Sequence, residues 1–145
     1  MAAPLPLHYA HLVLAAVWLG FLVGALAMSY RGSGALIEYH RLYGRIALAA
    51  LALVGLLGLA MATYLGGPSD WFRFGTFTGR VGEKMISFLI IAALGGYMHH
   101  SLARKMEARE GSEETLLKRY RVVATIALIV TLGTMLLGSM ITKGA

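Results

Sequence analysis

Apolar residues run in four long stretches along the chain, and charged residues are confined to the segments between them. The stretches without Asp, Glu, Lys or Arg are 1–30, 46–69, 85–103 and 122–142. The apolar interior of a bilayer is about 30 Å thick, which a helix of roughly 20 residues spans. A backbone inside lipid has to satisfy its own hydrogen bonds. The pattern therefore predicts four transmembrane helices.

The predicted fold is all-α, a bundle of four transmembrane helices in a single domain (1–145) that runs up, down, up and down. The helices are expected at about 7–30, 38–65, 83–106 and 115–142. A cleavable secretory signal would need a basic start and a short apolar stretch. The first seven residues carry no basic side chain, and the apolar stretch continues to Met28. We therefore expect the first helix to be retained.

Composition agrees with this pattern. Of the 145 residues, 58% are hydrophobic and 14% are charged, whereas an ordinary soluble domain is about 25% charged. The mean hydropathy is +0.70. These values exclude a disordered chain and most soluble enzymes, and the bilayer is the expected partner. The chain has no cysteine, which excludes disulfides and thiolate metal sites.

The positions of the basic residues predict the orientation, because Lys and Arg are enriched in cytoplasmic loops. One side is assigned nine basic residues: Arg31, Arg41, Arg45, Arg104, Lys105, Arg109, Lys118, Arg119 and Arg121. The other side is assigned four: Arg73, Arg80, Lys84 and Lys143. The first side is expected to be cytoplasmic, with both termini on the outer side of a bacterial cytoplasmic membrane. The net charge of +6 then reflects membrane orientation, and no nucleic-acid partner is expected.

The connection between the second and third helices is rich in aromatic residues. Gly66-Gly67-Pro68 ends the second helix, and the aromatic residues follow at once. They are Trp71, Phe72, Phe74 and Phe77. Aromatic rings favour the headgroup region of a bilayer. We expect a short interfacial segment over about 68–80.

Histidine supplies the ionisable groups in and near the spans. An ionisable residue inside a membrane is costly and is a functional candidate by default, but the four stretches contain no Asp or Glu. This weighs against multidrug transporters and carboxylate-based ion pumps. The candidates are His11, His40, His99, His100 and Lys84. Imidazole is an axial ligand of haem iron, and copper is the next candidate metal. Alternatively, a histidine near a bilayer surface can be only a polar residue at the interface.

Helix geometry divides these candidates between two levels. His8 and His11 are three residues apart, share a helix face and cannot hold one iron from opposite sides. Lys84 lies at the outer level with His11, whereas His99 is fifteen residues further on, or about 22 Å deeper. Axial ligands of one iron are only about 4 Å apart, so one haem cannot use both His11 and His99. The candidate partners for His11 are Met61, Met85, Met140 and Lys84, or none.

At the inner level, His40 is expected to face His99 or His100. His40 precedes the uncharged part of its helix by six residues, or about 9 Å. This places His40 at the interface while His99 lies inside the span. The pairing is therefore expected to be weak.

Three motifs carry a resemblance to a known family. The string His11-Leu-Val-Leu-Ala-Ala-Val-Trp18-Leu-Gly20 resembles the first helix of the CopD/HemJ-like superfamily of small four-helix bacterial membrane proteins. Helix three is similar too, with Lys84 at its start and Tyr97-Met98-His99-His100 near its end. The segment His40-Arg41-Leu42-Tyr43-Gly44-Arg45 resembles the basic lead-in to helix two of that family.

The resemblance implies a b-type haem and, for the HemJ branch, protoporphyrinogen oxidase activity that depends on a histidine of helix one and a lysine of helix three. Carried over, His11 would ligate the iron, and Lys84 would pair with a propionate of the haem or of the porphyrin substrate. Trp18 is counted with the cofactor-binding residues. Other branches of the superfamily include copper-resistance membrane proteins.

Three functions stay open at this point. The first is a haem b protein, with one or two haems, that transfers electrons or oxidises a tetrapyrrole. The second is a non-catalytic accessory subunit of a respiratory or photosynthetic complex, and the third is copper handling. A homo-oligomer or a larger membrane complex is compatible with each of them.

Overall fold

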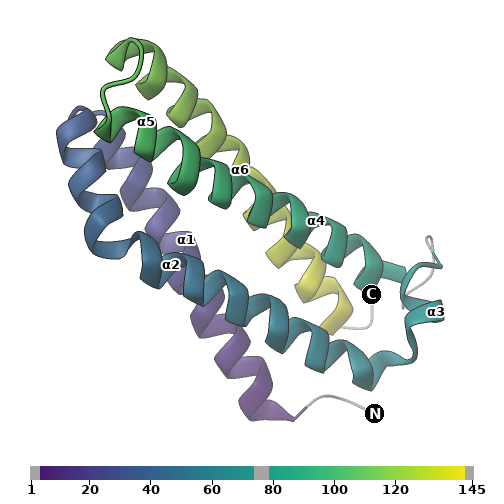
Figure 1. Ribbon diagram of the computed structural model, residues 1–145. Helices are drawn as coiled ribbons and strands as arrows, with labels where there is room; N and C mark the ends of the chain where they lie inside the picture. The colour runs from purple at the N-terminus through teal and green to yellow at the C-terminus, as the bar shows by residue number, and fades with distance from the viewer. Residues whose placement is uncertain (1–3, 74–78, 143–145) are drawn as a thin grey trace.

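The computed structural model describes residues 4–73 and 79–142, without the side chains of residues 65 and 137–142. Every regular element in this part of the chain is helical (Figure 1). The elements are α1 (Leu5–Ser29), α2 (Ser33–Ala62), the 3₁₀ turn η1 (Thr63–Leu65), α3 (Pro68–Trp71), α4 (Gly79–Gly96), the π-helical turn η2 (Tyr97–Leu102), α5 (Ala103–Glu107) and α6 (Glu113–Thr142).

Four helical segments are long and apolar enough to cross a membrane. They are Leu5–Ser29, Ser33–Ala62, Gly79–Glu107 and Glu113–Leu136. The third of these joins α4, η2 and α5 into one helix. The predicted all-helical class with four membrane-spanning helices is confirmed, and the chain is a multi-pass membrane protein.

Large apolar side chains face outward on all four long helices. Val13, Leu56, Leu89 and Ile129 are each more than 60% exposed, one from each helical segment. Isolated exposed apolar residues are common in soluble proteins, but a continuous belt of them would not be stable in water. These side chains are suited to contact with lipid.

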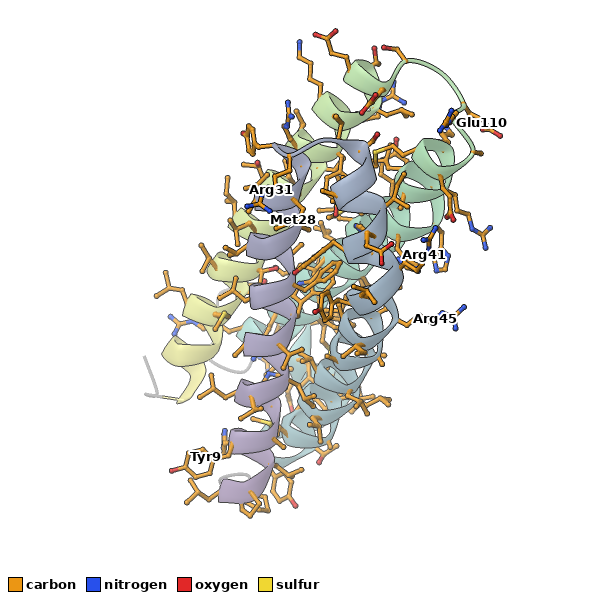
Figure 2. The ribbon with its side chains drawn as sticks, turned by 90° about the vertical axis from the view of Figure 1, so that its left-hand side faces the viewer. Tyr9, Met28, Arg31, Arg41, Arg45 and Glu110 are labelled. Carbon is orange, nitrogen blue, oxygen red and sulfur yellow. The ribbon has the colours of Figure 1, made fainter. Side chains whose placement is uncertain are left out.

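Two helices begin earlier than the charge pattern predicts. α2 begins at Ser33 and α4 at Gly79, whereas the expected starts are about 38 and 83. Arg41 and Arg45 therefore lie on α2, where Figure 2 shows both side chains pointing away from the bundle. The uncharged stretches mark the part of a helix that lipid covers, and the helix continues beyond it as exposed polar turns. Arg41 ties one such turn to α5 through an ion pair with Glu107 (3.0 Å).

The structure describes only part of the aromatic connection that is expected at the membrane interface. Only its first residues form α3, and Trp71 is buried (6% exposed) between Ala62 and Val81. The carbonyl oxygen of Trp71 occupies the space that a side chain at Gly82 would need. Phe72 is exposed; Phe74 and Phe77 lie outside the described residues. Trp71 thus packs α3 against α2 and α4.

The core runs along the axis of the bundle, with Trp18 near its middle. The Trp18 indole donates a hydrogen bond to Oγ1 of Thr131 on α6 (3.3 Å). On α4, Gly95 makes room for the ring, because a Cβ there would lie 2.8 Å from the indole. Gly24 likewise gives room to the Tyr39 side chain, whereas nothing approaches a Cβ at Gly20.

Candidate functional site

The structure brings the two residues singled out on helices one and three together at one end of the bundle. Nε2 of His11, on α1, lies 3.4 Å from Nζ of Lys84, on α4. Both side chains are half-buried. We refer to this part of the bundle as the His11 end.

The His11 ring is held against α2. A Cβ at Gly58 would lie 3.3 Å from Cε1 of His11, so the ring packs directly on the α2 backbone. Nδ1 of His11 is buried and has no hydrogen-bond partner among the described residues. The ring therefore presents Nε2 to Lys84 and leaves Nδ1 unpaired.

Two of the three methionines considered as partners of His11 have side chains in the described part of the structure. Met85 packs against the cluster of Trp71, Ala62 and Val81. Met61 is half-buried on the last turn of α2, and the side chain of Met140 lies outside the described part of the structure. Lys84 is the expected partner that the structure places against the imidazole.

A second polar cluster joins α2, η2 and α6 at the opposite end, which we call the His40 end. Nδ1 of His40 lies 3.2 Å from Nδ1 of His99, and Nε2 of His40 contacts the hydroxyl of Tyr120. One pair of tautomers satisfies all three groups: Tyr120 O–H donates to His40, and the Nδ1–H of His40 donates to His99. Tyr120 is fully buried and His40 is 3% exposed. The cluster is therefore a hydrogen-bonded joint between three helices.

A glycine on α2 makes room for this joint, and a π-helical turn carries one of its histidine rings. A Cβ at Gly44 would lie 2.6 Å from Cε1 of His99, so only glycine leaves room for that ring. His99 and His100 lie in the π-helical turn η2; such turns are rare and occur frequently at functional sites. His100 is exposed, with its ring edge-on to that of His99 at 5.0 Å between centroids.

The expectation that His40 lies too far out to pair well with His99 is wrong. α2 extends past the charged residues as a regular helix, which carries His40 into the bundle, where it is buried. Sequence reasoning also missed Tyr120. It lies between Arg119 and Arg121, within the predicted fourth helix, and a large aromatic residue among charges was the available signal.

The two clusters occupy separate levels. His11 contacts Lys84, whereas His99 contacts His40, so His11 and His99 do not face each other. Trp18 lies between the levels, seven residues after His11, which is about 10 Å along the helix. Trp18 is buried in the core rather than placed beside either histidine cluster.

In residues 4–73 and 79–142, no group of three or more His, Asp or Glu side chains is placed to hold a metal ion. The described side chains therefore do not form a cage for a bare ion. Comparison of the chain with protein-family models, with curated proteins and with solved structures gave no match.

Proposed function

We propose that this chain is a b-type haem-binding protein of the bacterial cytoplasmic membrane that transfers electrons or oxidises a tetrapyrrole such as protoporphyrinogen. The resemblance to CopD/HemJ-like proteins suggests this class. The observation that carries the proposal is the His11 imidazole, which directs Nε2 toward Lys84 inside an otherwise apolar bundle.

The donor set at the His11 end suits a haem better than a bare metal ion. A porphyrin supplies four iron ligands itself, so the protein needs to supply only one or two. A copper or zinc ion would need several side chains together, and the described residues offer no such group. The absent side chain of Gly58 leaves the His11 ring seated on the α2 backbone, which would fix its orientation.

In this proposal His11 holds the iron, and Lys84 pairs with a carboxylate of the tetrapyrrole. A b-type haem bound there would supply one-electron chemistry, and the protein would supply position and electrostatics. Lys84 is well suited to its role because its half-buried ammonium has no ion pair among the described residues. We assign one haem, at the His11 end, since His40 and His99 already satisfy each other.

The proposed topology is up-down-up-down, with both termini on the outer side of the membrane. It is supported by the excess of Lys and Arg near the His40 end, which the positive-inside rule assigns to the cytoplasm. The chain has no cysteine, so single cysteines can report exposure cleanly. A thiol reagent that does not cross membranes should label Tyr9→Cys in intact cells and should not label Glu110→Cys; these positions lie at opposite ends of the bundle (Figure 2).

The haem assignment is tested by spectroscopy on purified protein. We expect a b-type α-band after reduction and about one haem per chain by the pyridine haemochrome assay. His11→Ala should lose the haem, whereas His8→Ala, one turn earlier on the same helix, should keep it. Protein purified from haem-replete cells without a haem signal, or a His11→Ala variant that keeps its haem, would contradict the proposal.

A further inference from the structure

Arg80 is a half-buried cation that the proposed haem contacts leave unexplained. It lies in the first turn of α4, and its Nη1 atom is buried without a hydrogen-bond partner. Polar atoms buried in this way are uncommon in folded proteins, and each calls for a bound water, an ion or a ligand.

Arg80 and Lys84 lie on one face of α4. They are four residues apart, a spacing that places their Cβ atoms roughly 5–6 Å from each other. Lys84 points toward His11 on α1, so Arg80 is placed one turn nearer the helix start on the same side. Two half-buried cations thus lie on one face of α4.

No carboxylate compensates these charges in the part of the chain that the structure describes. Its ion pairs link Arg41 to Glu38 and Glu107, and Arg73 to Asp70. The nearest acid along the helix, Glu83, makes no ion pair with either cation. The indole N–H of Trp71, on the neighbouring α3, is a further buried donor without a partner. Among the described residues, Arg80 and Lys84 therefore have no carboxylate ion pair, and a buried indole N–H without a partner lies on the neighbouring α3.

We propose that Arg80 and Lys84 form an oxyanion site that binds the carboxylates of a tetrapyrrole. The assignment to a tetrapyrrole rests on the proposed function; the oxyanion chemistry does not. A planar guanidinium makes two parallel hydrogen bonds to a carboxylate, and an ammonium adds a second point charge. A b-type haem and its precursors carry two propionates on one edge of an apolar ring, which matches two adjacent cations in an apolar bundle.

The test uses a porphyrin without iron, so that it does not depend on haem ligation. Wild-type protein in nanodiscs of zwitterionic lipid is titrated with protoporphyrin IX and with its dimethyl ester, and binding is followed by porphyrin fluorescence. Wild type should bind the free acid more tightly than the ester. Arg80→Gln should weaken binding of the acid about ten- to a hundredfold, the loss expected for a charged hydrogen bond, and should leave ester binding unchanged.

Matched variants decide between the possible outcomes. Arg31→Gln removes the same charge from an exposed position at the far end of the bundle (Figure 2) and should change nothing. Arg80→Lys should recover part of the affinity, which a folding defect would not allow. Equal binding of acid and ester by wild type, or unchanged acid binding by Arg80→Gln, would overturn the proposal.

Two further arms separate this site from its alternatives. If Arg80→Gln weakens binding of phosphatidylglycerol and not of the porphyrin acid, the occupant is a lipid headgroup and the tetrapyrrole assignment is wrong. His11→Ala should keep the preference for the acid over the ester even though it loses haem. Failure of the haem assignment and failure of the oxyanion site therefore give different results.

Discussion

Gly44→Ala should break the joint at the His40 end with one methyl group. The added Cβ would lie 2.6 Å from Cε1 and 2.7 Å from Nδ1 of His99. Carbon atoms in favourable contact are about 3.5–4.0 Å apart, so the His99 ring would have to move by roughly 1 Å. That shift removes the 3.2 Å contact between His99 and His40.

The expected cost combines three effects. Overpacking of a well-filled core costs about 1–3 kcal/mol, and losing one hydrogen bond adds about 0.5–1.5 kcal/mol. Alanine returns up to about 1 kcal/mol because it favours a helix over glycine. Gly44→Ala should therefore lower the free energy of unfolding by about 0.5–4.5 kcal/mol.

The assay is chemical unfolding in detergent micelles followed by circular dichroism. Gly133→Ala is the matched control, since no atom lies within 4 Å of a Cβ at that position, and it should be neutral or slightly stabilising. Nitrogen NMR of the histidine rings gives an independent readout of the contact between His40 and His99. A Gly44→Ala protein that is as stable as the control and keeps that contact would refute the packing argument.

Two further substitutions test the joints between helices. Tyr120→Phe removes the hydroxyl that contacts Nε2 of His40 and leaves that nitrogen buried without a partner. This substitution should destabilise the fold by about 1–3 kcal/mol. The control Tyr97→Phe, at a more exposed position, should be neutral in the same unfolding assay. Arg121→Met removes the hydrogen bond from Nη2 to the Ser29 carbonyl at the end of α1 (2.8 Å). We expect faster amide hydrogen exchange in the last turn of α1. Unchanged protection there would show that this contact does not stabilise the helix end.

Much of the fold could be read from charge placement. Lipid cannot hydrate a charged group, so a run of about 20 uncharged residues marks a span. The helix ends were less predictable, because a helix that leaves the membrane can continue in water. α2 does so at Arg41, which is exposed and forms ion pairs with Glu38 and Glu107. Hydropathy does not predict where a helix ends once it has continued beyond the uncharged stretch.

The candidate site was predicted in part, for a geometric reason. Counting residues along helices one and three puts His11 and Lys84 at one level, and the structure places them 3.4 Å apart. The same counting gave the wrong depth for His40, because it took the uncharged stretch as the measure of what is buried. The sequence marks Arg80 only as a charge in a connecting segment, whereas the structure places it on α4 with its Nη1 atom buried.

The sequence by itself determined that this chain crosses a membrane four times, because that property depends on the length and charge of single segments. Only the tertiary structure decided which side chains meet. The contacts of His40 with His99 and with Tyr120, and the contact of His11 with Lys84, each join residues at least 59 positions apart in the chain. They come from helices whose rotation about their axes is set by packing. In apolar helices, hydropathy marks no preferred face, and small residues such as Gly44 and Gly58 decide where the rings fit.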